Sequence, residues 1–210
     1  MLYNSLKRAL DILGSVIGLI IFSPILLATA IFIKLVSSKG PVFADTPKRV
    51  GQSGVEFRMY KFRTMIPNAH QFLLDNPELY EKYKKNNFKL DPDPRWLPGA
   101  NFIRKFSIDE LPQFINILIG NMSLVGPRAY YPFELRDQQI IYPDTAPHIQ
   151  EVQSVKPGLT GLWQVSGRSG ISFPDRIKMD SYYSRKRSIS YDIYLLIKTP
   201  VALLSGRGAC

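Results

Sequence analysis

The longest hydrophobic stretch lies near the N-terminus, where residues 12–33 carry no charged side chain. A straight helix of that length extends about 33 Å, which just crosses the hydrocarbon core of a bilayer. Three interpretations fit this pattern. The segment could be a secretory signal peptide with a small-residue cleavage site at residues 28–30, or a helix that spans the membrane. The third alternative is a re-entrant helix, which enters and leaves the membrane on the same face.

Two features favour the re-entrant helix. Pro24, near the middle, removes a backbone hydrogen bond and can bend the helix, and the hydroxyl of Ser23 can satisfy a freed carbonyl. Basic residues also flank both ends of the segment, so the positive-inside rule puts both ends in the cytoplasm. These flanking residues are Lys7 and Arg8 on one side and Lys34, Lys39, Lys48 and Arg49 on the other. The apolar run continues past residues 28–30, which argues against a signal peptide.

The pattern beyond this segment predicts an α+β domain that is mainly helical. Val55, Phe57 and Met59 alternate with polar residues after a turn signal at residues 51–54, which predicts a hairpin or short strand pair within residues 41–65. The clearest helix prediction comes later in the chain, at residues 107–119.

In this predicted helix Ser107 is the N-cap and Glu110 completes a capping box, and Gly120 ends the helix. An apolar stripe marks its buried face. The stripe consists of Ile108, Leu111, Ile115 and Leu118.

Further helices are predicted at residues 68–89, in parts of residues 132–153 and at residues 173–187. Pro143 and Pro147 break the second of these regions. Residues 157–168 are expected to be loop or strand around Trp163. The apolar segment 189–204 contains Pro200 and is too broken for a span, so we expect it at the membrane surface or packed under the first helix.

Composition narrows the choice of partner. Lys and Arg number 27 against 17 Asp and Glu, a net charge of +10, which favours nucleic acid, anionic lipid or phosphorylated substrates. The basic residues are dispersed and show no nucleic-acid motif, so we expect no nucleic acid. The single cysteine, Cys210, excludes an intrachain disulfide, and His70 and His148 form no zinc pattern with it.

Asp109 and Glu110 are the candidate catalytic carboxylates. Their alternative role is structural, because acidic residues in a first helical turn complement the helix dipole. Arg104 and Lys105 lie just upstream and Arg128 just downstream, and such cations favour an ionised carboxylate and attract phosphate. An ionised Asp beside a phosphate is a plausible nucleophile and a hard oxygen ligand for Mg²⁺.

A second group of candidates follows towards the C-terminus. Arg168, in a glycine-rich loop, is either a phosphate ligand or a surface arginine. Trp163, Tyr182 and Tyr183 either stack on a nucleobase or belong to the core.

Taken in order, these motifs resemble the bacterial sugar transferase family, the monotopic polyprenyl-phosphate phosphoglycosyltransferases, in their minimal catalytic form without the additional N-terminal membrane domain of larger members. The similarity covers nearly the whole chain. The matching stretches are Ser23-Pro24, residues 60–65, Arg104, residues 107–113, residues 121–128, residues 156–168 and residues 180–183.

The resemblance implies a re-entrant helix broken at Ser23 and Pro24, and a catalytic pair at Asp109 and Glu110. In the family the Asp attacks the β-phosphate of a UDP-sugar and releases UMP, and polyprenyl phosphate then takes the sugar phosphate from the enzyme. Mg²⁺ is the implied cofactor, with Asp109 among its ligands. This reaction initiates exopolysaccharide, capsule or O-antigen synthesis.

The resemblance also implies the substrate site and the location. Arg104, Arg128 and Arg168 match phosphate-binding or active-site arginines, and the matched motifs add further candidates, namely Lys61, Pro157, Trp163 and Tyr182. Residues 161–164 resemble members that use UDP-galactose or UDP-glucose. The expected layout is a membrane helix at residues 1–39 and a catalytic domain at residues 40–210, on the cytoplasmic face of the bacterial inner membrane and in contact with anionic lipid. Homo-oligomer formation stays open.

Two rival functions remain at this stage. A membrane-bound phosphatase or nucleotide-sugar hydrolase would use the same Asp without a lipid acceptor. A non-catalytic membrane adaptor would use its charge to bind anionic lipid and would tolerate Asp109→Asn.

Overall fold

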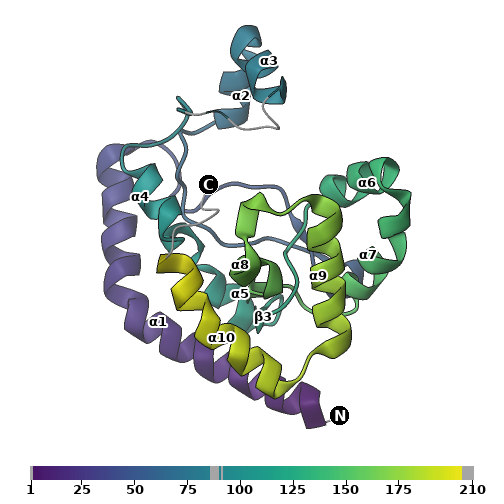
Figure 1. Cartoon of the computed structure of the whole chain (residues 1–210). Helices are drawn as coiled ribbons and strands as arrows, with labels where there is room; N and C mark the ends of the chain where they lie inside the picture. Colours follow the sequence, from purple (N-terminus) through teal and green to yellow (C-terminus); the bar gives the residue numbers. More distant parts are fainter. Residues whose placement is uncertain (1, 86–89, 91, 205–210) are drawn as a thin grey trace.

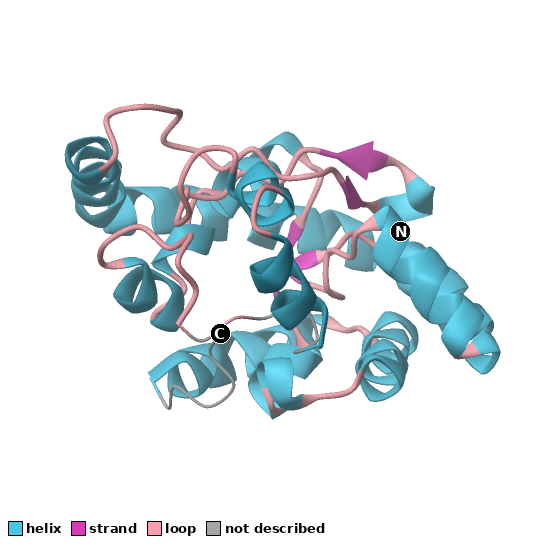
Figure 2. Ribbon diagram, turned by 90° about the horizontal axis from the view of Figure 1, so that it is seen from above, coloured by secondary structure: helices cyan, strands magenta, loops and turns pink. Residues whose placement is uncertain are grey.

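A computed structural model describes residues 2–85, 90 and 92–204 of the chain, so that Cys210 lies outside the described residues. Helices make up most of the fold, as predicted, and the strands form two small pairs (Figure 2). The long helix α1 (Leu2–Val36) curves around one side of the molecule, and α10 (Ile189–Leu204) lies next to its N-terminal part (Figure 1).

Helix α1 contains Pro24, and its backbone is repaired at that position. A proline cannot donate to the carbonyl four residues earlier, which here belongs to Ile20. The hydroxyl of Ser23 donates to this carbonyl at 2.8 Å instead. The predicted compensation by Ser23 is therefore confirmed.

The N-terminal half of α1 packs tightly on the rest of the chain. A Cβ atom on Gly14 would lie 2.5 Å from Leu124, and one on Gly18 would lie 2.7 Å from the ring of Phe114. Most large apolar side chains of α1 are nevertheless exposed, including Ile20 at 67%. Within the described residues, α1 is the one helix long and apolar enough to cross a membrane.

The predicted hairpin is present. Strands β1 (Arg49–Val50) and β2 (Glu56–Phe57) pair antiparallel around a 3₁₀ turn at Gln52–Gly54. Phe57 and Met59 are buried, as their alternation predicts, whereas Val55 is 67% exposed.

The region predicted as one helix at residues 68–89 instead contains α2 (Ala69–Leu74) and α3 (Pro77–Lys85). Pro77 lacks the N–H needed to continue α2, but it fits the first turn of a new helix. Residues 86–89 lie outside the described part of the chain. Helix α4 (Ala100–Lys105) follows.

The prediction of one capped helix at residues 107–119 is wrong. Ser107 has a left-handed backbone (φ +54°), Ile108–Glu110 form a 3₁₀ turn, and α5 starts only at Gln113. A capping box needs an extended N-cap residue, so Ser107 cannot form one. Pro112 has no N–H to continue the hydrogen-bond ladder and becomes the N-cap of α5.

Helix α5 (Gln113–Ile119) ends at Gly120, as predicted, with φ of +92° at that glycine. Its buried face differs from the predicted stripe, since Phe114 and Ile117 are buried whereas Ile115 and Leu118 are only partly covered. The main core forms where α5, α1 and strand β3 (Ser123–Val125) meet, with Met122 and Leu195 also buried in it.

Strands β3 (Ser123–Val125) and β4 (Gly158–Thr160) pair in parallel. The backbone segments approach so closely that a Cβ on Gly158 would lie 2.0 Å from the nitrogen of Gly126. Only glycine fits at this position.

The last part of the domain is a helical layer around a second core that includes Tyr130, Ile149 and Ile177. Trp163 lies in a helix and not in the predicted loop or strand, and Pro147 starts α7 instead of breaking it. Proline suits a first helical turn because its missing N–H has no partner there. The elements are α6 (Pro132–Ile141), a 3₁₀ turn (Pro143–Thr145), α7 (Ala146–Gln153), α8 (Leu162–Ser166), a 3₁₀ turn (Arg168–Gly170) and α9 (Phe173–Lys186).

Candidate active site

An ion pair with a buried carboxylate joins two distant parts of the sequence. The ammonium Nζ of Lys61 lies 2.7 Å from Oδ2 of Asp109 and 3.6 Å from Oε1 of Glu110. Asp109 is 2% exposed, whereas the side chain of Glu110 is 39% exposed. The structure therefore brings three predicted site residues together, with one carboxylate enclosed and the other open to solvent.

Backbone contacts fix this arrangement. The N–H of Phe62 donates to the carbonyl of Asp109 at 2.9 Å, and Phe62 forms a bridge with Phe43. Asp109 lies in the 3₁₀ turn that precedes α5, so its side chain projects from a tight, non-α segment. The lysine and the carboxylate are thus held by adjoining pieces of main chain.

Burial and charge oppose each other in this pair. Burial raises the pKa of Asp109, and Lys61 and Arg104 counteract that rise. Burial disfavours the charged form of Lys61, but the carboxylates of Asp109 and Glu110 outweigh it and raise the pKa of Lys61. The sequence predicted an Asp whose ionisation is favoured by nearby cations. The structure adds that Lys61 is the main cation that favours this ionisation, and that the burial of Asp109 opposes it.

Arg104 and Arg168 approach the same region from two other elements. Arg104 lies in the last turn of α4, with its guanidinium carbon 5.3 Å from the centre of the Trp96 ring. Arg168 has φ of +55° and donates through Nη2 to the hydroxyl of Ser107 at 2.8 Å. This bond takes up the hydroxyl that was expected to cap a helix.

Arg128 belongs to a cluster that sequence reasoning only partly found. Its guanidinium carbon lies 5.1 Å from the ring centre of Trp163, and that of Arg176 lies 5.7 Å from the same ring. The carboxylate of Glu134 lies 4.0 Å from Arg128 and 3.2 Å from Arg176. Arg176 was missed because it sits in a charged helix with nothing local to distinguish it.

Asp180 contacts this cluster through hydrogen bonds. It is fully buried, and its Oδ2 accepts hydrogen bonds from the backbone N–H of Arg128 (3.0 Å) and the hydroxyl of Tyr130 (2.9 Å). Burial raises the pKa of Asp180 to about 7, although these hydrogen bonds and the neighbouring arginines counteract it. Sequence reasoning noted Asp180 as part of a motif and gave it no role.

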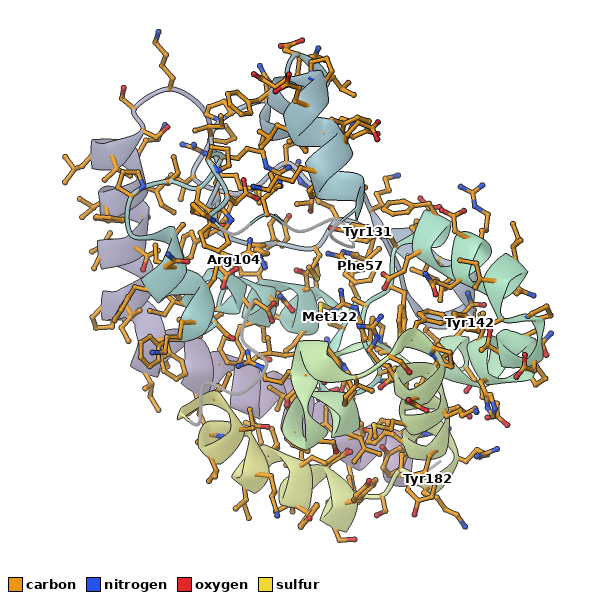
Figure 3. The ribbon with its side chains drawn as sticks, turned by 45° about the horizontal axis from the view of Figure 1, so that its top comes forward. Phe57, Arg104, Met122, Tyr131, Tyr142 and Tyr182 are labelled. Carbon is orange, nitrogen blue, oxygen red and sulfur yellow. The ribbon has the colours of Figure 1, made fainter. Side chains whose placement is uncertain are left out.

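Two predicted substrate residues are placed differently. Tyr182 is 47% exposed on α9, and Figure 3 shows it at the far lower end from Arg104 and Tyr131. Pro157 lies next to β4, where its carbonyl accepts from the N–H of Ser123. Tyr182 therefore lies far from Arg104, whereas Pro157 lines a small cavity together with Arg128. Tyr183 is a core residue whose hydroxyl donates to Asp192 at 2.6 Å.

The arrangement suits nucleophilic chemistry on an anionic substrate. A carboxylate in a poorly solvated site is a stronger nucleophile than one in water, provided that a cation keeps it ionised. Guanidinium groups on neighbouring elements can hold phosphate oxygens in fixed positions.

Comparison with known proteins gives one consistent family. Residues 2–206 match the family model described as bacterial sugar transferase. The exopolysaccharide production protein ExoY of Sinorhizobium fredii is 37% identical over 97% of this chain and 87% of its own length.

Two longer relatives carry more specific names. The undecaprenyl-phosphate galactose phosphotransferase of Salmonella typhimurium is 40% identical over 97% of this chain and 41% of its own length. A UDP-N-acetylgalactosamine-undecaprenyl-phosphate N-acetylgalactosaminephosphotransferase of Aeromonas hydrophila is 38% identical over 99% of this chain and 46% of its own length. The chain thus spans less than half the length of these two relatives.

Proposed function

Because the chain belongs to the bacterial sugar transferase family, we propose that this transferase moves a sugar 1-phosphate from a UDP-sugar to undecaprenyl or another polyprenyl phosphate. The observation that carries the proposal is the enclosed carboxylate of Asp109, which faces the ammonium of Lys61 at 2.7 Å. The relatives named as undecaprenyl-phosphate sugar phosphotransferases support the same reaction class.

The first half-reaction starts at Asp109. A carboxylate oxygen attacks the β-phosphorus of the UDP-sugar and forms an acyl phosphate bond. The bond from this phosphorus to the bridging oxygen breaks, and UMP leaves with that oxygen and its electron pair. Lys61 keeps Asp109 ionised before the attack, and Arg104 contributes positive charge on the same side.

The second half-reaction regenerates the enzyme. A phosphate oxygen of the polyprenyl phosphate attacks the same phosphorus, and the bond to Asp109 breaks to return the carboxylate. One phosphoanhydride is broken and one is formed over the whole cycle, so the exchange is nearly isoenergetic. Two alternating substrates and a covalent intermediate predict ping-pong kinetics.

Mg²⁺ is the proposed cofactor. The carboxylates of Asp109 and Glu110 converge on one ammonium group, so they offer hard oxygen ligands in one place. Two carboxylates suit Mg²⁺, which usually takes one or two carboxylates and completes its shell with water and substrate phosphate. When bound, the ion neutralises charge on the transferring phosphoryl group.

We also propose that α1 is re-entrant, with both ends on the cytoplasmic face of the bacterial inner membrane. Arg8, near its start, donates to the carbonyls of Ile117 and Leu118 at 2.7 Å. Beyond its end, the carbonyls of Ser37 and Lys39 accept from Arg63 at 3.1 and 3.3 Å. A straight helix of 35 residues would extend about 50 Å and separate its ends across a bilayer. Contact of both ends with one domain supports a single face.

Cysteine labelling tests the re-entrant helix. In a Cys210→Ser background, Asn4→Cys and Ser38→Cys place one thiol near each end of α1, both at exposed positions. We expect a membrane-impermeant thiol reagent to label both from the cytoplasmic face in inverted vesicles and neither in right-side-out vesicles. Labelling of the two sites from opposite faces would establish a spanning helix instead.

The donor sugar is proposed as UDP-galactose or UDP-glucose, from the resemblance of residues 161–164. Relatives named for galactose and for N-acetylgalactosamine are similarly close, at 40% and 38% identity. The donor panel must therefore include N-acetylated sugars.

The activity experiment uses the full chain in detergent with Mg²⁺, undecaprenyl phosphate and a panel of UDP-sugars, and it measures UMP release. We expect release that requires lipid, prefers one sugar and is lost in Asp109→Asn. The matched control is Asp137→Asn, which changes an exposed carboxylate on α6 and should leave release unchanged.

Two other outcomes would redirect the assignment. Steady UMP release without lipid would identify a nucleotide-sugar hydrolase. A folded sample that releases no UMP with any sugar, lipid and metal would favour the membrane adaptor, in which the charged groups bind anionic lipid.

A further inference from the structure

Three arginines from separate elements form a compact basic cluster. Arg49 lies on β1, Arg128 follows β3, and Arg176 lies on α9. Arg128 and Arg176 flank the carboxylate of Glu134. The buried guanidinium of Arg49 donates to the carbonyl of Ala129, the residue after Arg128, and its charge interacts with those of Arg128 and Glu134. We call Arg49, Arg128 and Arg176 the arginine cluster.

Aromatic rings hold these guanidinium groups in place. The guanidinium carbon of Arg49 lies 3.3 Å from the ring centre of Tyr131. Arg128 and Arg176 share the rings of Trp163 and Tyr130, with distances between 5.1 and 6.0 Å. Stacked guanidinium groups lose little further freedom when they bind a ligand, so the cluster is preorganised.

The cluster carries donors that its surroundings do not use. Within the described part of the chain, the buried Nε atoms of Arg49, Arg128 and Arg176 have no hydrogen-bond partner. Arg49 is itself only 8% exposed. Burying a donor without an acceptor costs free energy, so a ligand that supplies an acceptor to these atoms would bind favourably.

Charge and access point to the class of ligand. Among the described residues, the three guanidinium groups have two neighbouring carboxylates, the directly paired Glu134 and the buried Asp180, so the positive charge is in excess. The side chains of Arg128 and Arg176 remain 29% and 14% exposed, which gives an anion access to them. Paired guanidinium forks match the oxygens of a phosphate, and a monoester near neutral pH carries nearly two negative charges.

We propose that the arginine cluster is a second phosphate-binding site, next to the Lys61–Asp109 pair, which takes a phosphate monoester and in which Arg176 is a direct ligand. The charges of Arg49 and Glu110 interact, so the cluster lies within electrostatic range of the reacting carboxylates. The monoester is either the UMP leaving group or the head group of the polyprenyl phosphate. The identification of the monoester as UMP or polyprenyl phosphate rests on the proposed function. Binding of the phosphate to the arginine cluster does not require turnover.

Binding to the full chain in detergent tests the site without catalysis. Isothermal titration calorimetry with UMP, and separately with a short-chain polyprenyl phosphate, would compare wild type, Arg176→Gln and Arg136→Gln. Arg136 is an exposed arginine on α6 and serves as the control for net charge. We expect Arg176→Gln to weaken one ligand about tenfold, the loss of one charged hydrogen-bonding partner, and Arg136→Gln to leave binding unchanged.

The two ligands distinguish the two sources. Weaker UMP binding alone assigns the cluster to the nucleotide, and weaker lipid phosphate binding alone assigns it to the acceptor. Weakening of both supports a site that the two half-reactions use in turn. Unchanged binding of both ligands to folded Arg176→Gln protein would overturn the proposal.

Two further variants distinguish a loss of ligand binding from a loss of the fold. Arg176→Lys keeps the charge but not the planar fork, so we expect an intermediate loss of affinity. Glu134→Gln removes the competing negative charge, so affinity should rise severalfold. A purely structural role for the cluster predicts a fall in both variants. Arg176-dependent UMP binding in a protein that turns over no UDP-sugar would keep this site and reject the proposed transferase reaction.

Discussion

Two buried groups of charges in this molecule differ in how completely they are partnered. At the N-terminal end of α1, Oδ1 of Asp11 accepts from Ser123 and from the N–H of Leu124, and it also lies 3.3 Å from Lys7. Lys7 lies 3.0 Å from Asp192 on α10. This group holds α1, β3 and α10 together, and we call it the anchor.

The candidate active site is built on a different principle. The buried carboxylate of Asp109 depends on Lys61 for its charge, its neighbour Glu110 is open to solvent, and the nearby arginine cluster keeps buried donors without acceptors in the described residues. A fully partnered set of buried charges stabilises a fold, whereas a partly partnered set keeps capacity to bind a ligand. The two regions should therefore respond oppositely to neutralisation of an aspartate.

The largest expected effect is on turnover. Asp109→Asn should reduce UMP release by at least about a thousandfold, because the nucleophile is lost. Its stability at neutral pH should change little, because two effects oppose each other. Burial raises the pKa of Asp109, so its ionisation opposes folding as pH rises and Asn removes that cost. Asn also removes one partner that raises the pKa of Lys61, but Glu110 stays 3.6 Å from that ammonium. Thermal unfolding in detergent measures this. A large drop in melting temperature would show that Asp109 stabilises the fold, as the anchor does.

The matching change in the anchor should do the reverse. Asp11→Ala leaves Lys7 and the N–H of Leu124 without their partner, so unfolding free energy should fall by about 3–5 kcal/mol. Denaturant titration in detergent measures the loss, with Asp137→Ala on α6 as an exposed control. A stable Asp11→Ala protein would show that packing alone holds α1 to the domain.

A third test concerns the pH dependence of activity. Lys61→Gln removes the main cation that lowers the pKa of Asp109, so that pKa should rise further. Since the attacking carboxylate must be ionised, the acid limb of the pH–rate profile should move to higher pH. Part of the lost activity should return in alkaline buffer. A profile that only drops at every pH would assign Lys61 to binding and not to ionisation.

The smallest expected effect lies at the end of α5. Arg8 donates to two carbonyls of that last turn, through both terminal nitrogens. Arg8→Lys keeps the charge but cannot donate to both carbonyls in the same way. The free energy of unfolding should therefore fall by about 1 kcal/mol while turnover is retained. Lost turnover in a stable Arg8→Lys protein would connect this contact to the chemistry.

Local patterns predicted much of the fold. Ser23 and Pro24, the hairpin around residues 51–54 and the stop at Gly120 each depend on residues close in sequence, and the structure confirms them. The failure at Ser107 is informative, because its partner is Arg168, which lies 61 positions away. A tertiary contact overrides a local capping signal.

The site was predictable to the extent that its residues share motifs. Lys61, Asp109 and Glu110 were identified and do meet in space. Arg49 was counted only as a flanking charge and Arg176 not at all. Their significance depends on Tyr131, Trp163 and Glu134, which folding brings to them from other elements.

The contacts of α5 with α1 also have a consequence for access to the carboxylates. Arg8 donates to the last turn of α5, and Phe114 in its first turn packs against Gly18 and Phe22, so this short helix lies along α1. Asp109 and Glu110 come just before the start of α5. With α1 in the membrane as proposed, the reacting carboxylates then lie close to the lipid layer. The enzyme should therefore select acceptors by the phosphate that reaches this layer, and tolerate wide variation in the length of the tail beneath it.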